Sequence, residues 1–335
     1  MSLVLRREEL PRALLDDLTG RPAAPSDGPQ ARAARVDGDT WLDQLPRRVA
    51  EALDRWRLVR DENQDLRAGF TALVVPVRRP RGDLGALKVA WPHTEADTEH
   101  LALRAWRGQG AVELLAADPP GGTLLLERLD ADRDLMTGSV LATTEVLGSL
   151  LRTLDRPAPP WAPTLSAALE RIGPRLEQFG TQALAGRSFP RRMTQQALSL
   201  TRDLLSDNGT DEGAHRLDRR LVHTDLHQMN VLWRPHPGEW VAIDPKVLAG
   251  DPHWAVVPAL RNRWDDVLAA HDVRAHLRLR LGLLCDTAGL DEDRAAAMTI
   301  VRVVPDAVDS IKEGGASQER WVARAVTIVK AVQPG

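Results

Sequence analysis

The segment 219–251 constrains the fold of this chain more than any other. Two short apolar runs, at 230–233 and 240–243, predict β-strands. The five residues between them, Arg-Pro-His-Pro-Gly at 234–238, are typical of a turn. The segment therefore predicts a tight hairpin with polar residues crowded at its ends.

Three oxygen-bearing side chains fall at the ends of this hairpin. Asp225 lies on the loop that enters the first strand, Asn230 begins that strand, and Asp244 ends the second. We expect the three side chains to converge on one edge of the hairpin. Their spacing is that of a phosphoryl-transfer catalytic loop. In such a loop one Asp accepts the proton of the substrate hydroxyl, while the Asn and the second Asp hold Mg²⁺.

Two other interpretations of the segment remain open. His223, Asp225, His227 and His236 are close in sequence, as they would be in a zinc or two-metal hydrolase. No second cluster of His or Cys completes a usual ligand set, which disfavours that interpretation. The hairpin could also be purely structural.

The composition is typical of a globular protein of about two domains. The chain has 335 residues, of which 43% are hydrophobic and 27% charged, and its formal net charge is -3. Because there is no basic excess, nucleic acid is not an expected partner. No apolar stretch approaches the ~18 residues of a membrane span, and residues 1–9 lack the apolar core of a signal peptide. We therefore expect a cytoplasmic enzyme with no membrane partner, in which the single cysteine, Cys285, is a buried thiol.

Residues 60–127 predict an antiparallel sheet with one helix. Strands are predicted at 70–77, 85–90, 111–115 and 123–129, and a helix at 94–107. Lys88 lies within an apolar strand, where an unpaired ammonium group is costly. It is either a surface-facing lysine of an edge strand or a phosphate-binding lysine. Glu95 and Glu99 on the following helix favour the second interpretation, because a strand Lys paired with a helix Glu orients nucleotide phosphates in protein-kinase-like lobes.

Most of the remaining chain predicts helices. They are expected at 46–58, from about 135 to 154, and at 165–179 (with a disturbance at Gly173-Pro174), 190–205, 254–270, 272–287, 291–312 and 317–332. The predicted fold class is α+β, with a small antiparallel β lobe and a larger, mainly helical lobe. We divide it into an N-terminal helical extension (1–59), a β-rich nucleotide-binding lobe (60–127) and a helical catalytic and substrate lobe (128–335).

Taken together, these motifs resemble the aminoglycoside and hydroxyurea antibiotic-resistance kinases, and most of all their streptomycin 6-phosphotransferase branch. The resemblance runs from about Trp41 to Val332. It includes the segments 89–93, 108–112, 124–129, 223–227, 230–232, 243–246, 250–252 and 260–263. Many small-molecule kinases share the catalytic-loop motif alone. Its combination with Leu-Leu-Leu-Glu-Arg-Leu at 124–129 and Asp-Pro-Lys at 244–246 is much more specific.

The resemblance implies a bilobal protein-kinase-like fold that uses ATP and Mg²⁺ to phosphorylate an alcohol group of a small molecule. By matching motifs, Asp225 resembles the catalytic base, and Asn230 and Asp244 resemble the Mg²⁺ ligands. His223 and His227 would support the catalytic loop through hydrogen bonds.

The same resemblance implies a set of nucleotide-binding residues. Lys88 would contact the phosphates, with Glu99 as its partner. Glu127 and Leu129 would offer backbone groups to adenine, and Gly69 would belong to the loop that covers the phosphates.

The sequence departs from the family in two places. The loop over the nucleotide should be rich in glycine, so that backbone N–H groups can approach phosphates, but only Gly69 is present in Arg-Ala-Gly-Phe-Thr at 67–71. An acidic residue is also expected shortly after Gly-Asp-Pro, where this chain has His-Trp-Ala at 253–255. Both departures motivate the alternative of a non-catalytic nucleotide-binding pseudokinase. The presence of the expected lysine, catalytic Asp and metal ligands argues against it.

The acceptor is expected to be an aminoglycoside such as streptomycin, in which case the role would be antibiotic resistance, or a related cyclitol. An unrelated hydroxylated metabolite is an equal competitor. Aminoglycosides are polycationic, so their binding sites should be lined with carboxylates. Five carboxylates of the helical lobe are candidates for that lining, although each could instead be a solvated charge on a helix face: Asp251, Asp265, Asp266, Asp306 and Asp309.

Overall fold

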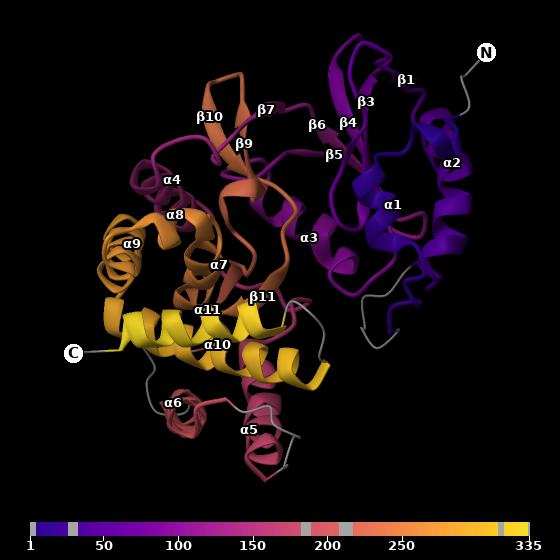
Figure 1. Cartoon of the computed structure of the whole chain (residues 1–335). Coiled ribbons are helices and arrows are strands. Elements are labelled where there is room, and N and C mark those ends of the chain that lie inside the picture. Colours follow the sequence, from indigo (N-terminus) through magenta and orange to yellow (C-terminus); the bar gives the residue numbers. More distant parts are fainter. Residues whose placement is uncertain (1–4, 26–32, 182–188, 208–216, 314–317, 334–335) are drawn as a thin grey trace. The chain divides into compact units, whose positions relative to one another are not determined.

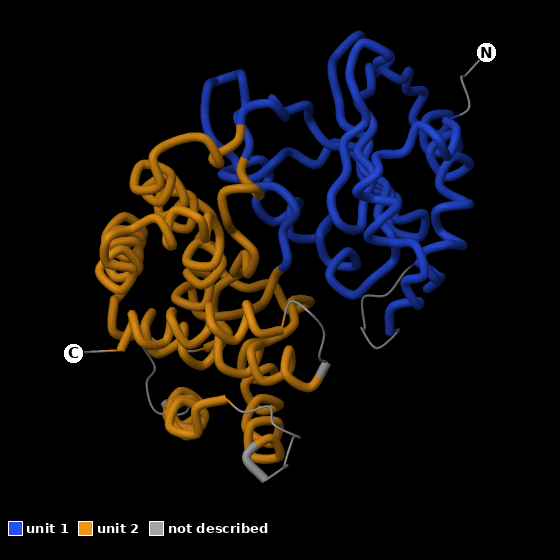
Figure 2. The backbone as a smooth tube through the Cα atoms, viewed as in Figure 1, with its two compact units in different colours: residues 1–133, 232–246 blue, residues 134–231, 247–335 orange. Residues whose placement is uncertain are grey.

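The computed structural model describes residues 5–25, 33–181, 189–207, 217–313 and 318–333. The chain forms two compact units, coloured separately in Figure 2. Residues 1–133 and 232–246 make up unit 1, and residues 134–231 and 247–335 make up unit 2. The segment predicted as one helical lobe, 128–335, is thus shared between the units, because residues 232–246 return to unit 1.

Unit 1 is built on an antiparallel sheet with the strand order β1-β3-β4-β6-β5, with β2 paired to β3. These strands are β1 (Val59–Arg60), β2 (Arg67–Ala68), β3 (Ala72–Arg78), β4 (Leu84–Ala90), β5 (Leu114–Asp118) and β6 (Thr123–Glu127). The strand predicted at 111–115 begins only at Leu114. The reason is that Val112 donates its backbone N–H to the carbonyl of Ala242 and is drawn away from the sheet.

Helices cover one side of this sheet, as Figure 1 shows for α1 and α2. The helices of unit 1 are η1 (Arg7–Glu9), α1 (Arg12–Leu18), α2 (Gly38–Arg55) and α3 (Ala96–Trp106). α2 begins at Gly38 rather than near residue 46, because the Asp37 side chain caps it by accepting the N–H of Thr40 at 2.8 Å. Trp41 of α2 is fully buried and packs in one apolar core with Leu73 and Leu87 of the sheet.

The predicted hairpin is present as β9 (Val231–Arg234) and β10 (Glu239–Ala242). β7 (Asp130–Asp134) joins it to give the strand order β10-β9-β7. β7 was not predicted, because its sequence Asp-Ala-Asp-Arg-Asp carries no apolar alternation. Trp233 and Trp240 meet edge to face at 5.1 Å between ring centroids, and the guanidinium of Arg133 lies 3.7 Å from the Trp233 ring centroid.

Unit 2 is mainly helical, and its described elements are as follows. The helices are α4 (Val140–Thr153), α5 (Leu165–Thr181), α6 (Arg191–Asp207), η2 (Gln228–Asn230), η3 (Pro252–Ala255), α7 (Val256–Arg261), α8 (Trp264–Ala269), α9 (Val273–Ala288), α10 (Glu292–Glu313) and α11 (Gln318–Val332). β8 (Arg220–His223) pairs antiparallel with β11 (Val247–Gly250). α10 and α11 lie side by side, as Figure 1 shows, and α10 also packs on α5, α6 and α9.

Two helix predictions in unit 2 were wrong in detail. α5 continues through Pro174, where a disturbance was expected. The helix predicted at 254–270 is divided into η3, α7 and α8, and Arg263, in a left-handed backbone conformation with φ 52°, separates α7 from α8. Cys285 is a buried free thiol, as predicted, and burial raises its pKa to about 12. Among the described residues, no helix is long and apolar enough to cross a membrane.

Candidate active site

Lys88 is a buried cation at the centre of the unit 1 sheet. It lies on β4 between Val74 of β3 and Leu124 of β6, so it is not on an edge strand, and it is only 7% exposed. Its Nζ donates to both carboxylate oxygens of Glu99, at 2.7 and 2.8 Å, and to Oδ1 of Asp244 at 2.5 Å. One buried ammonium group therefore joins a strand, a helix and the end of the β9–β10 hairpin.

The structure shows which of two glutamates is the partner of Lys88: Glu95, the N-cap of α3, or Glu99, within α3. Glu99 is 4% exposed and faces Lys88. Glu95 is exposed, and its carboxylate lies 3.6 Å from His93 and 3.9 Å from Lys246. Lys88 is thus paired with Glu99 and not with Glu95.

The carboxylates of Glu99 and Asp244 keep the buried Lys88 ionised. Burial alone would lower the pKa of Lys88, but the carboxylates of Asp244 and Glu99 outweigh it and raise the pKa well above the ordinary value. Burial raises the pKa of Glu99, and the charge of Lys88 opposes that effect. Lys88 is therefore a permanent cation at neutral pH, held by two acceptors in a fixed position.

Asp244 follows β10 in a left-handed backbone conformation, with φ 51°. Its side chain is 51% exposed, although one oxygen is held by Lys88. A non-glycine residue in that conformation is uncommon, and such strain is concentrated at functional sites. The carboxylate is held in place and still accessible, which suits a metal ligand.

The remaining nucleotide-site candidates of unit 1 lie on a turn and a connector. Gly69 is in the turn between β2 and β3, where its N–H bonds to the carbonyl of Ala72 at 3.0 Å, and the neighbouring Phe70 is 72% exposed. Glu127 ends β6 and gives its N–H to the carbonyl of Glu113 at 3.0 Å. Leu129 lies just beyond and is 8% exposed.

Arg234 fixes this connector, a role that the sequence did not suggest. Its Nε donates to the two carboxylate oxygens of Glu127 at 3.1 and 3.0 Å, and its terminal nitrogens donate to the carbonyls of Gly108 and Ala111. Burial would lower the pKa of Arg234, but the hydrogen bonds with Glu127 raise it. The end of β9 is thereby tied to the end of β6.

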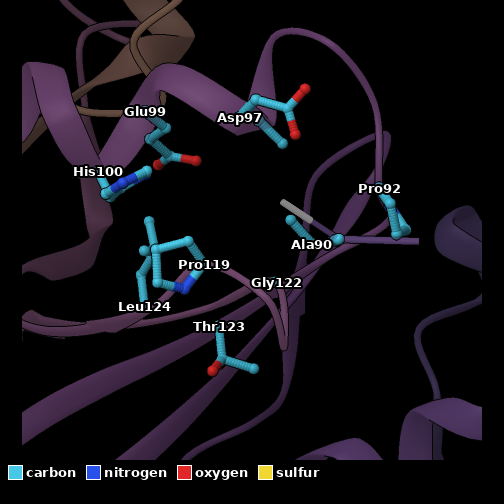
Figure 3. A pocket seen from close by; sticks show the side chains of 11 residues that line it. Ala90, Pro92, Asp97, Glu99, His100, Pro119, Gly122, Thr123 and Leu124 are labelled. Carbon is cyan, nitrogen blue, oxygen red and sulfur yellow. The ribbon is translucent and has the colours of Figure 1, made fainter. Parts of the chain in front are cut away.

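A small cavity of about 30 Å³ lies behind Glu99 (Figure 3). Asp97, Glu99 and His100 of α3 face the turn between β5 and β6, from which Gly122 and Thr123 contribute. The Oγ1 of Thr123 is buried there without a hydrogen-bond partner. A cavity of this size holds about one water molecule, so it is not a nucleotide site.

In unit 2, the loop after β8 carries Asp225. The backbone N–H of Asp225 bonds to Nδ1 of His223 at 3.2 Å, and its carbonyl accepts from Nδ2 of Asn230 at 2.9 Å. His227 accepts the N–H of Met229 through Nδ1 at 3.2 Å, while its Nε2 lies 3.7 Å from the Asp225 carboxylate. The side chains around Asp225 therefore hold its backbone on both sides.

These contacts bear on the hydrolase interpretation. His223 and His227 each use Nδ1 in the loop, and His236 is exposed on the turn between β9 and β10. Within the described ranges, no group of three or more His, Cys, Asp or Glu side chains could hold a metal ion. A zinc site of the usual composition is therefore not assembled by the described residues.

Arg302 of α10 also holds the Asp225 loop, a contact that no sequence pattern indicated. Its terminal nitrogens donate to the carbonyl of Thr224 at 2.6 Å and to that of Trp254 at 2.9 Å. Its guanidinium lies 5.5 Å from the Trp254 ring centroid. Burial lowers the pKa of Arg302 to about 10, which leaves it charged at neutral pH.

A pocket of about 170 Å³ opens beside Asp225 within unit 2. It is lined by Asp225, His227, Pro258, Arg261, Asn262, Arg302, Trp321 and Arg324. Three of these residues are arginines and one is a carboxylate.

Most of the carboxylates considered for the acceptor site already have basic partners. Asp251 is 3% exposed and bonds to His253 and, at 2.7 Å, to Nε of Arg294. Burial would raise the pKa of Asp251, but the hydrogen bonds from His253 and the charge of Arg294 lower it. His253, in the segment 253–255 that follows Gly-Asp-Pro, thus pairs with Asp251.

The other four carboxylates lie on helices. Asp265 is exposed on α8. Three form ion pairs with arginines, in the pairs Asp266–Arg263, Asp306–Arg261 and Asp309–Arg175. None of the five lines the pocket beside Asp225, although Asp306 forms an ion pair with Arg261, which does.

Comparison with known proteins agrees with this geometry. Residues 55–314 match the family described as aminoglycoside/hydroxyurea antibiotic resistance kinase. The chain belongs to this family. It is 37% identical to the streptomycin 6-kinase of Streptomyces glaucescens, over 90% of this chain and 94% of that protein. It is 38% identical to the hydroxyurea phosphotransferase of Kitasatospora aureofaciens, over 90% of this chain and 83% of that protein.

Solved structures show the same fold at low sequence identity. An aminoglycoside phosphotransferase in a ternary complex with AMP-PNP and hygromycin B matches with a TM-score of 0.53 and 14% identity, over 86% of this chain and 98% of that one. An amicoumacin kinase in complex with AMP-PNP, Ca²⁺ and its ligand also gives a TM-score of 0.53, with 14% identity over 87% of this chain and 96% of that one. The fold is therefore the α+β, protein-kinase-like fold that the sequence predicted. As a member of its family, this chain is a small-molecule phosphotransferase.

Proposed function

We propose that this phosphotransferase transfers the γ-phosphoryl group of ATP, in the presence of Mg²⁺, to an alcohol group of a small molecule. The observation that supports this most is the position of Lys88 between Glu99 and Asp244. A buried strand lysine held by a helix glutamate is the arrangement that fixes nucleotide phosphates in kinase-like folds.

The residues present fit the nucleotide and its metal. Lys88 keeps its charge, and Glu99 holds its Nζ in place, so a phosphate oxygen can take over the donor that Asp244 accepts in this structure. Mg²⁺ bound with a nucleotide takes only one or two protein carboxylates in addition to phosphate and water. Asp244, with its half-exposed side chain, and Asn230 are the proposed ligands. Bound Mg²⁺ would neutralise charge on the β- and γ-phosphates.

Asp225 is the proposed catalytic base. Its backbone is held by His223 and Asn230, so its carboxylate can be presented to an acceptor hydroxyl and can receive the proton. His223 and His227 are proposed to position this loop. In unit 1, Gly69 is proposed to lie over the phosphates, and the connector with Glu127 and Leu129 is proposed to meet adenine.

Streptomycin and hydroxyurea, the compounds in the names of two relatives, are the first acceptors to test. Purified protein is incubated with ATP, Mg²⁺ and single acceptors from a panel of aminoglycosides, cyclitols, hydroxyurea and hydroxylated carboxylates. Mass spectrometry then detects any acceptor that has gained one phosphoryl group. A phosphorylated product that requires both ATP and Mg²⁺ is expected. ATP binding without product from any acceptor would instead favour a pseudokinase.

A further inference from the structure

The pocket beside Asp225 carries more positive than negative charge. Of its eight lining residues, Arg261, Arg302 and Arg324 are basic and Asp225 alone is acidic. The other lining residues are His227, Pro258, Asn262 and Trp321. A pocket built for a polycation would need the opposite balance, with several carboxylates facing the ligand.

The three arginines differ in how far their charge is compensated. Arg261 bonds to Asp306 at 2.7 Å, so a carboxylate balances its charge. Arg302 bonds to two backbone carbonyls, which leave its net charge unchanged. Arg324 stacks over the ring of Trp264, 5.1 Å from its centroid, and forms no ion pair with any described residue.

We propose that this pocket receives an oxyanion of the acceptor, so that the acceptor is a hydroxylated compound bearing a carboxylate or a similar anionic group. Guanidinium groups bind such oxyanions through paired N–H donors. Arg324 supplies charge that no described carboxylate balances in an ion pair, and Arg302 adds charge that the carboxylates of Asp225 and Asp306 offset in part. The assignment rests on the proposed phosphotransfer function, because Asp225 in the same pocket is the base that the hydroxyl would meet.

The test uses D-gluconate and its uncharged amide, D-gluconamide, as a matched pair of probes. Binding of each to the full-length protein is measured by titration calorimetry. We expect gluconate to bind about tenfold or more tightly than gluconamide. Charge reversal by Arg324→Glu should remove that preference. Arg320→Glu is the matched control, because Arg320 lies on the same helix but is exposed and outside the pocket, and it should keep the preference.

Three results would overturn the proposal. One is equal binding, or no binding, of both probes to the unaltered protein. Another is loss of the preference in Arg320→Glu as much as in Arg324→Glu. The third is tighter binding of streptomycin than of gluconate, with Arg324→Glu improving the binding of streptomycin.

The same titrations distinguish the two possible sources of the anion. If AMP-PNP with Mg²⁺ displaces gluconate, the pocket takes a nucleotide phosphate, and the assignment to the acceptor is wrong. If gluconate binds with the expected preference but no compound of the panel is phosphorylated, the anion site stands and the proposed phosphotransfer to an acceptor fails.

Discussion

The guanidinium of Arg302 donates a hydrogen bond of 2.6 Å to the backbone carbonyl of Thr224, the residue that precedes Asp225. A second bond, to the carbonyl of Trp254, ties the same side chain to η3. Helix α10 thereby holds the loop that presents the proposed base. Positioning of this kind accounts for much of the catalysis in phosphoryl transfer.

Replacing Arg302 should lower turnover more than nucleotide binding. In Arg302→Met both carbonyls lose their donor, so the loop shifts and kcat should fall about 10- to 100-fold. Arg302→Lys keeps the charge but lacks the planar set of guanidinium N–H donors, so its kcat should lie between those of Arg302→Met and the unaltered enzyme. Steady-state kinetics gives kcat, and calorimetry gives the Kd for AMP-PNP, which should change little.

Arg278→Met is the control for the loss of a partly buried arginine that donates hydrogen bonds to backbone carbonyls. Arg278 donates to the carbonyls of Ala331 and Gln333 at the end of the chain. Its replacement should lower stability by about 1–3 kcal/mol and leave kcat unchanged. An Arg302→Met enzyme with normal kcat would show that Arg302 has a structural role only.

A double variant should separate the effect of the Lys88–Glu99 pair on stability from the role of Lys88 in catalysis. Lys88→Met leaves Glu99 buried without its counter-charge and should destabilise the protein by about 3–5 kcal/mol. Adding Glu99→Leu removes that buried charge, so the double variant should recover most of the stability while remaining inactive. Urea denaturation and the turnover assay are measured on the same preparations. Activity in the double variant comparable to that of the unaltered enzyme would mean that Lys88 does not contact the phosphates.

Gly69 tests whether the turn between β2 and β3 covers the nucleotide. A Cβ at Gly69 would meet no atom within 4 Å, so Gly69→Ala should fold normally. If backbone N–H groups of this turn approach the phosphates, the added methyl group should raise the KM for ATP several-fold, on the order of tenfold at most. Gly173→Ala on α5 has equal space and should leave the KM unchanged. Identical KM values for ATP in both variants would remove Gly69 from the site.

Asp251, which bonds to His253 and Arg294, should stabilise the folded protein at neutral pH and less so in acid. The pKa of Asp251 is lower in the folded protein than its ordinary value, so its ionised form stabilises the fold above the unfolded-state pKa, about 3.9. That contribution is lost as the pH falls through the folded-state pKa. Asp251→Asn should therefore cost about 3–5 kcal/mol at pH 7 and progressively less below about pH 4.

Urea denaturation across that pH range measures this difference, and Asp265→Asn provides the control. Asp265 is exposed on α8, so its replacement should change stability little at any pH. A constant difference between Asp251→Asn and the unaltered protein from pH 7 to pH 3 would contradict the linkage.

The strongly patterned elements could be predicted from sequence, and the weakly patterned ones could not. The β9–β10 hairpin, β4 with Lys88 and the long helices α9 to α11 follow from apolar periodicity and turn residues. β8 and β11 pair with each other across the intervening β9–β10 hairpin, so no turn between them marks the pair. β7 consists mostly of charged residues and carries no apolar period. α2 begins earlier than predicted because Asp37 caps it, although the residues before it have a loop-like composition.

In the candidate site, sequence motifs indicated the residues with proposed chemical roles but not the residues that hold them in place. Asp225, Lys88 and Glu99 stand in recognisable contexts, whereas Arg234 and Arg302 are ordinary arginines of a strand and a helix. Their contacts join residues far apart in the chain, such as Arg302 and Thr224, and no local pattern encodes such a contact. For the same reason the sequence could not show that arginines line the pocket beside Asp225.

The measurement that tests the account most directly is turnover of Asp225→Asn with the acceptor that the product screen identifies. The substitution keeps the size of the side chain and the backbone contacts to His223 and Asn230, but removes the proton acceptor. We expect kcat to fall by about 10²- to 10⁴-fold, with an unchanged melting temperature and an unchanged Kd for AMP-PNP. A correctly folded Asp225→Asn protein that phosphorylates the acceptor at the rate of the unaltered enzyme would contradict the account.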